Sequence, residues 1–292
     1  MGHINFKKQS QHEYYFRYSL MRFFLFIVTF FLSLNCAASL LITPSRVVFE
    51  DRTRTSQVTL VNKGTETTTY RISFIRQNMT EDGKFVPVEE NEKGLYSDEM
   101  VRYSPRQIVL EPGQSQIVRL MLRKPRGLAD GEYRSHMLLQ ALPKITKSDI
   151  SKAVTKGSNE ISVEITTIIG VSIPVIVRHG KLNAEVDLAN AHYVKSSDPK
   201  VKSHVVLDMK RTGNRSAYGD FRVNYIPEDG EAVVVGNVKG VAVYSPNKLR
   251  RFQIPINTPS EFEYEKGRFH ITYSESGKDE SSGLIASIDL NL

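Results

Sequence analysis

The chain has 292 residues, of which 39 are Lys or Arg and 32 are Asp or Glu, and it contains one cysteine, Cys36. Domains of about 100 to 150 residues are typical, so this length predicts two domains. The positive surplus is mild and the sequence has no run of five or more basic residues, so it gives no support to nucleic-acid binding. A single cysteine also excludes disulfides within the chain and a thiolate metal site.

An apolar segment at residues 23–34 follows two arginines and precedes the small residues NCAAS. A basic start, an apolar run too short to span a bilayer and a small-residue exit predict a secretory signal peptide, residues 1–38. Translation could start at Met21 rather than Met1. Two alternatives remain open: an uncleaved anchor helix, and a lipoprotein modified at Cys36.

Short alternating segments separated by glycine-containing turns fill the first half of the chain. This pattern predicts about seven short strands before residue 178, as in an immunoglobulin-like sandwich. Tyr133 is a candidate for the tyrosine corner of such a fold, or it is an ordinary half-buried aromatic. The acidic stretch 88–100 is expected to be an exposed loop. The expected strands are 41–49, 56–62, 69–74, two within 104–122, one within 130–142, and the long segment described next.

Residues 160–178, EISVEITTIIGVSIPVIVR, have apolar side chains at every odd position from 161 to 177 except Thr167. Alternation of this length, rich in β-branched residues, predicts one unusually long strand. Either the strand is the central core strand of a sandwich, or it extends beyond its own sheet and offers an apolar row to a partner chain.

After Arg178-His179-Gly180 the strand pattern stops and then restarts, which indicates a hinge between domains. No helix of ordinary length is expected. The prediction is an all-β protein with two immunoglobulin-like β-sandwiches in tandem, residues 39–179 and 180–292. The strands expected in the second half are 184–194, 203–211, 218–226, 232–246, 250–256, 267–273 and 284–292.

Few residues suggest catalytic or metal chemistry. Five histidines follow residue 38, and none lies three to five residues from another histidine or a cysteine, which is the spacing of common metal sites. The motifs GxSxG and HExxH and a glycine-rich phosphate loop do not occur. The sequence therefore favours a protein that is not an enzyme and that uses no cofactor, metal or small-molecule substrate.

Four features of the first half occur together: TPSRVVF with Arg46, the block SPRQIVLEPGQSQIVRL, the block DGEYRSHMLLQALP, and an alternating strand that ends IPVIVRHG. In this order and spacing they resemble the first domain of periplasmic pilus chaperones of the P-pilus type, which serve the chaperone-usher pathway. The resemblance covers about residues 40–180. The second half is similar only in length and strand style.

In that family two immunoglobulin-like domains form a boomerang with a cleft, and the last strand of the first domain is lent to a subunit that lacks its own final strand. The resemblance implies a periplasmic chaperone whose partners are pilus or fimbrial subunits and an outer-membrane usher. The side chains donated here would be Ile161, Val163, Ile165, Thr167 and Ile169.

The family also holds the terminal carboxylate of the subunit with an arginine on the first strand and a lysine on the last. Arg46 matches the arginine, although it could instead be a surface strand residue. Pro174 stands where the lysine is expected, so the sequence departs from the family here. Either Arg178 or Arg134 completes the anchor, or Arg46 holds the carboxylate alone.

A second function stays open, that of a secreted structural adhesin or pilin-like protein built of tandem sandwiches. A subunit that polymerises by strand donation should carry a free, alternating N-terminal extension. Here the alternating strand is internal and precedes a second domain, so the sequence favours the chaperone.

Overall fold

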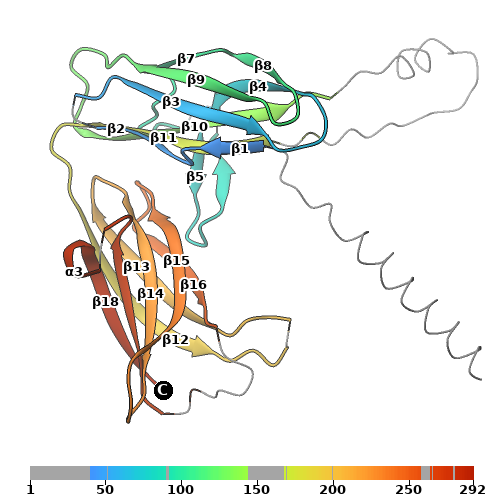
Figure 1. Cartoon of the computed structure of the whole chain (residues 1–292). Helices are drawn as coiled ribbons and strands as arrows, with labels where there is room; N and C mark the ends of the chain where they lie inside the picture. Colours follow the sequence, from blue (N-terminus) through green and yellow to red (C-terminus); the bar gives the residue numbers. More distant parts are fainter. Residues whose placement is uncertain are drawn as a thin grey trace, which may run out of the picture.

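The computed structural model describes residues 40–50, 52–89, 92–143, 168, 170–198, 200–257, 264, 266–278 and 280–292. These residues form two β-sandwiches, one after the other along the chain (Figure 1). The predicted all-β fold with two immunoglobulin-like sandwiches is confirmed. The predicted signal peptide and Cys36 lie outside the described residues, and no helix within those residues is long and apolar enough to cross a membrane.

The first sandwich consists of two sheets and a small hairpin. Each sheet has one face toward a shared core, so inward and outward side chains alternate along the strands. The first sheet has the order β1 (Leu40–Thr43), β3 (Thr55–Asn62), β9 (Ser115–Leu122) and β7 (Val101–Ser104). The second has the order β2 (Val47–Phe49), β11 (Gly170–His179), β10 (Gly131–Ala141), β4 (Thr68–Ile75) and β8 (Gln107–Leu110). The hairpin pairs β5 (Gln77–Met79) with β6 (Phe85–Pro87).

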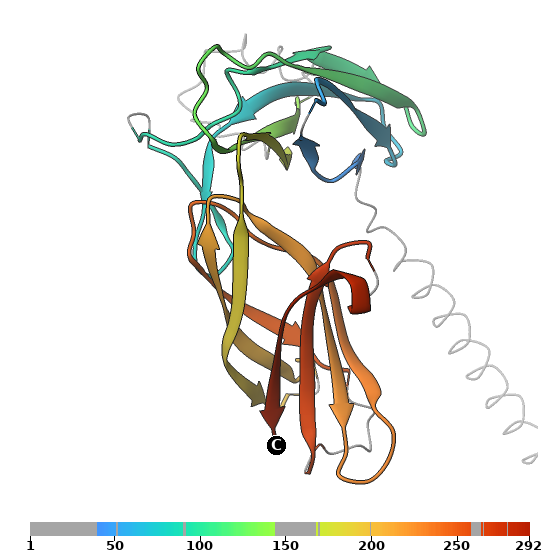
Figure 2. The same ribbon diagram turned by 90° about the vertical axis from the view of Figure 1, so that its left-hand side faces the viewer.

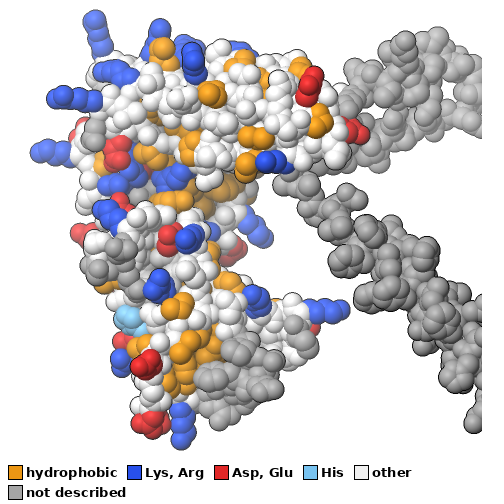
Figure 3. All heavy atoms as spheres, viewed as in Figure 1, with side chains coloured by type: hydrophobic (Ala, Val, Ile, Leu, Met, Phe, Trp, Pro, Cys, Tyr) orange, Lys and Arg blue, Asp and Glu red, His pale blue; other side chains and the backbone are white. Residues whose placement is uncertain are grey.

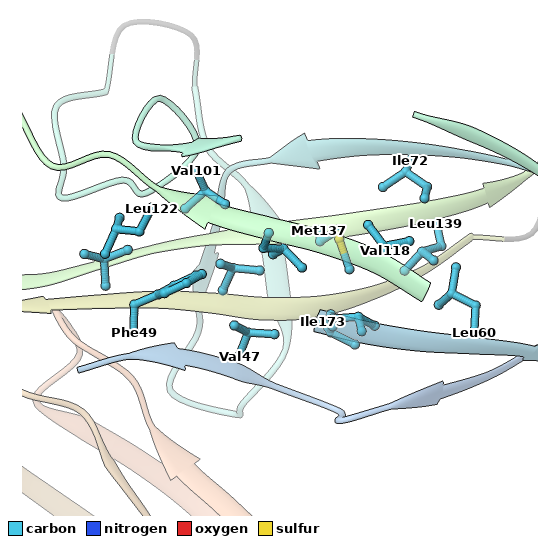
Figure 4. Close-up of a cluster of buried hydrophobic side chains, with 14 of the residues drawn as sticks. Val47, Phe49, Leu60, Ile72, Val101, Val118, Leu122, Met137, Leu139 and Ile173 are labelled. Atoms are coloured by element: carbon cyan, nitrogen blue, oxygen red, sulfur yellow. The ribbon is translucent and has the colours of Figure 1, made fainter. Parts of the chain in front are cut away.

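The core of the first sandwich follows the alternation seen in the sequence (Figure 4). On β9, Val118, Leu120 and Leu122 are buried while the residues between them are exposed. Tyr133 is also buried, and its hydroxyl donates to the backbone oxygen of Ala129 at 3.0 Å. A tyrosine whose hydroxyl bonds back to the chain a few residues upstream is a tyrosine corner, so that prediction is confirmed.

The second sandwich also has two sheets. One has the order β12 (Ala184–Val194), β13 (His204–Gly213) and β16 (Leu249–Pro255). The other has the order β15 (Val233–Val243), β14 (Ala217–Ile226), β17 (Arg268–Glu275) and β18 (Leu284–Asn291). A single helical turn, α3 (Glu280–Gly283), precedes β18. The rings of Phe221, Phe269 and Tyr273 are fully buried in the core of the second sandwich.

Two predictions about the first sandwich need correction. Residues 41–49 are not one strand, because the chain leaves the first sheet after Thr43 and joins the second at Val47, with a cis Thr43-Pro44 bond in between. The loop at 88–100 forms no strand in its described part, but it is not wholly exposed. Ser97 is fully buried and its hydroxyl donates to the backbone oxygen of Val175 at 2.7 Å, which ties the loop to the core.

The two sandwiches lie at an angle to each other and are in contact at one end (Figure 2). A small apolar cluster connects them, with Met79 and Ile176 from the first sandwich and Ala242 and Tyr244 from the second. The hairpin β5–β6 extends from the first sandwich onto the second (Figure 1). There the backbone N–H of Arg251 donates to the oxygen of Glu81 at 2.7 Å.

Candidate functional site

A cleft of about 430 Å³ lies where the two sandwiches meet. Strand β2 and the end of β11 form its wall on the first sandwich, and β12, β14 and β18 with the loop after β17 form its wall on the second. Both residues predicted to anchor a carboxylate, Arg46 and Arg178, line it. The remaining lining residues are Val48, Glu50, Ala184, Val186, Arg215, Ser216, Ala217, Tyr218, Glu275, Ser276 and Ile285.

Arg46 is positioned by the crossing of the chain between the two sheets. It lies in the bend just before β2, and its guanidinium carbon sits 3.8 Å from the centre of the Tyr218 ring on the other sandwich. Among the described residues no carboxylate pairs with it, and its buried Nε has no hydrogen-bond partner. A guanidinium that stacks on a ring and has no carboxylate beside it can still pair with an anion, because its fork of N–H groups matches a carboxylate.

Arg178 is in the opposite condition, because its charge is already neutralised. Its Nε donates to Glu132 at 3.1 Å, and its Nη1 donates to Glu50 at 2.9 Å. The side chain is only 9% exposed, and the other oxygen of Glu132 accepts a hydrogen bond from the hydroxyl of Ser216 on the second sandwich. Arg178 and Glu132 therefore brace the junction of the sandwiches, and Arg178 has less to offer a ligand than Arg46 has.

Arg134, the other basic residue considered for the anchor, does not line this cleft. Its guanidinium stacks on the ring of Tyr244 at 4.4 Å and is nearly fully buried. Burial lowers its pKa, and the nearby Tyr244 and Glu132 act against that shift. Pro174, which stands where a lysine was expected, pairs with His136 across β10 and β11 and also lies outside the cleft lining.

Strand β11 has an edge that is only partly covered. It pairs with β10 from Gly170 to His179, but β2 covers its other edge only from Val175 to Val177. Among the described residues no strand pairs with that edge from Gly170 to Pro174, and Val171 is 41% exposed. Such an edge presents unpaired backbone groups that can template an added strand.

The predicted donor residues Ile161, Val163, Ile165, Thr167 and Ile169 lie outside the described residues. What the structure describes of this strand is its second half, where Ile173, Val175 and Val177 point into the core of the first sandwich. The predicted donors share the odd numbering of these core residues.

Three residues of the site were not predicted from the sequence: Tyr218 and Glu50, which line the cleft, and Glu132, which pairs with Arg178 behind it. Tyr218 could not be found, since its stacking on Arg46 depends on how the sandwiches meet. Glu132 could have been considered from the sequence, because an arginine inside an apolar strand needs a carboxylate. Glu132 lies directly opposite Arg178 where β10 pairs with β11.

No protein-family model and no curated protein matches the chain. Matches to solved structures include the class 5 fimbriae chaperone CfaA, with 14% identity and a TM-score of 0.39 over 86% of this chain and 98% of that one. They also include the E. coli chaperone DraB, with 12% identity and a TM-score of 0.38 over 87% of this chain and 96% of that one. The Pseudomonas aeruginosa chaperone CupB2 matches with 13% identity and a TM-score of 0.38 over 86% of this chain and all of that one.

Proposed function

We propose that this protein is a non-enzymatic periplasmic chaperone that binds pilus or fimbrial subunits by lending them a β-strand, and that it delivers them to an outer-membrane usher. The observation that carries the proposal is the uncovered edge of β11 from Gly170 to Pro174. The alternating row that precedes this edge in the sequence supplies apolar side chains in the same phase as the core residues of the strand.

A subunit that lacks its last strand exposes a long apolar groove and unpaired backbone groups. An added strand satisfies both, because its backbone completes the hydrogen-bond ladder and its alternate side chains fill the groove. In this proposal Ile161, Val163, Ile165 and Ile169 fill the groove, with Thr167 as a weaker member.

The cleft supplies a second contact in this proposal. Arg46 would hold the terminal carboxylate of the subunit. It lies just before β2, the neighbour of β11 in its sheet, and no carboxylate among the described residues pairs with it, which supports this role. Arg178 then acts mainly through its buried pair with Glu132, which keeps β11 and the second sandwich in place.

The test of strand donation is a set of single substitutions in residues 161–169. Burying an Ile or Val side chain contributes about 1.5 to 3 kcal/mol, so an aspartate in the groove should reduce capture of a subunit at least about tenfold. Val163→Asp and Ile165→Asp should each show this loss when a pilus subunit is co-expressed and co-purified with the variant. The matched control Ser162→Asp, on the even side, should capture the subunit as the wild type does.

The thermal midpoint of each free variant completes this experiment. If the row is donated, the odd-side variants melt within a few degrees of the wild type. If Val163→Asp and Ile165→Asp unfold the free protein, the row packs in the protein's own core and strand donation by this segment is wrong. Unchanged capture by both variants would overturn the proposal equally.

A further inference from the structure

A second hollow, of about 740 Å³, lies on the outer face of the first sheet, across β3, β9 and β7. It shares no lining residue with the cleft between the sandwiches. We call it the arginine groove, because three of its lining residues are arginines and none is acidic. The residues that line it are Thr55, Ser56, Gln57, Arg102, Tyr103, Ser104, Arg119, Leu120, Met121 and Arg123.

The register of the sheet places two of these arginines close together. Arg102 lies directly opposite Met121, and Arg119 precedes Met121 by two residues on the same face of β9. Diagonal neighbours of this kind lie roughly 7 to 8 Å apart, and their Cβ atoms are somewhat closer. Both arginines are therefore neighbours of Met121 on the outer face of the sheet, and Met121 is 47% exposed.

The charges of the arginine groove are not compensated within the described part of the chain. Among the described residues, no ion pair or side-chain hydrogen bond joins Arg102, Arg119 or Arg123 to a carboxylate. The surface view shows lysine and arginine side chains over this part of the first sandwich with few acidic ones among them (Figure 3). Like charges at this spacing repel each other unless an anion lies between them.

We infer that the arginine groove docks an acidic segment of a partner protein. Each guanidinium can take a carboxylate in two parallel hydrogen bonds, and the flexible thioether of Met121 adapts to an apolar side chain between them. A polymer of phosphates would leave this apolar centre without a partner. A peptide that carries both carboxylates and apolar side chains can contact Arg102, Arg119 and Met121 together.

The position of the groove allows both sites to be occupied at once. Strands β7 and β9 lie on the side of the first sandwich away from the second one (Figure 1). A protein held in the cleft and along β11 therefore leaves the arginine groove accessible. The inference does not depend on what the cleft binds, so each can fail without the other.

The experiment uses a fluorescein-labelled twelve-residue peptide of Glu and Leu with a proline at every third position, because proline prevents the peptide from adding to the open edge of β11. Arg102→Glu combined with Arg119→Glu should weaken binding of this peptide at least about tenfold, since two charge-assisted contacts are reversed. The control Arg71→Glu reverses an exposed arginine on β4 in the other sheet and should bind as the wild type does. Binding by the wild type should also weaken as salt rises.

Three results would overturn the inference. The first is peptide binding that survives the double reversal, and the second is a loss of the same size in Arg71→Glu. The third is wild-type binding to phosphatidylglycerol vesicles without binding to the peptide, which would assign the face to a membrane surface. All the substituted side chains are exposed, and Arg102→Gln with Arg119→Gln provides a milder pair if the double reversal does not fold.

Discussion

At the scale of single residues, the two arginines of the cleft differ in their charge partners: Arg178 is paired with carboxylates and Arg46 is stacked on a ring. Arg178 is buried and faces two carboxylates, so removing it would leave Glu132 as an uncompensated buried charge. Arg46 has an aromatic ring for a neighbour and no carboxylate among the described residues. The first arrangement is that of a structural residue, and the second leaves the charge of Arg46 available for the binding role that we propose.

The substitution Arg46→Ala should separate binding from stability. Stacking of an arginine on a tyrosine contributes about 0.5 to 2 kcal/mol, so the thermal midpoint should fall by only a few degrees. Capture of secreted subunits should be lost, because the carboxylate then has no partner. Calorimetry and co-purification measure the two effects, and Arg71→Ala, an exposed strand arginine, is the control. A large fall in the midpoint with capture intact would make Arg46 a structural residue.

His136 gives the fold a dependence on pH. Its pKa is lowered to about 4, mainly because burial disfavours the charged imidazolium and also because Arg134 lies nearby. Neither ring nitrogen has a hydrogen-bond partner within the part of the chain that the structure describes. Between pH 6.5 and 4 the unfolded chain therefore binds a proton that the folded protein excludes. The stability contributed by the neutral ring is complete above pH 6.5 and decreases as the pH falls toward 4, by roughly 3 kcal/mol.

His136→Gln should remove most of this dependence. Urea unfolding of the wild type and the variant at about pH 7.5, 5.5 and 4.5 spans the range in which the ring titrates. The control is His192→Gln, because His192 is exposed. Its free energy of unfolding should change with pH as that of the wild type does. If the free energy of unfolding depends on pH equally in all three proteins, the pKa of His136 does not differ between the folded and unfolded states.

At the scale of elements, the strands of the second sandwich could be predicted closely from alternation. The expected strand 184–194 coincides with β12, and the others differ from the observed bounds by a few residues. The break between β1 and β2 was not predicted, because apolar residues of strand type stand before and after the segment Thr43–Arg46 and make the whole stretch look like one strand. Only the pairing partners, β3 for one half and β11 for the other, show where the chain changes sheets.

The same limit applies to the site. Arg46 could be found, because an arginine amid apolar strand residues requires a partner. The contact with Tyr218 joins residues 172 positions apart, and no local pattern encodes that separation. The donor row remains a prediction, since its five residues lie outside the described part of the chain.

At the scale of the whole molecule, the angle between the sandwiches is held by contacts of two kinds. Polar contacts include the Ser216 hydroxyl on Glu132 and the amide of Asn247, which donates to the oxygen of Met79 at 2.6 Å. Apolar contacts centre on Tyr244, which is buried beside Met79 and Ile176. The hairpin β5–β6 adds the ring of Phe85, 6.0 Å from that of Tyr244. The width of the cleft depends on this junction, because Arg46 and Tyr218 come from different sandwiches.

Tyr244→Ala should therefore loosen the junction without unfolding either sandwich. The side chain bridges the two sandwiches, so its loss removes apolar and cation–π contacts between them, including the one with Arg134. Small-angle scattering should show a larger maximum dimension than that of the wild type. Calorimetry should resolve two transitions for the variant, and we expect one for the wild type. The control Tyr193→Ala removes a ring that makes edge-to-face contacts with Tyr264 and Phe269 within the second sandwich. That variant should lower the stability of its own sandwich and leave the scattering profile unchanged. If Tyr244→Ala keeps the scattering profile and the single transition of the wild type, the polar contacts alone hold the angle.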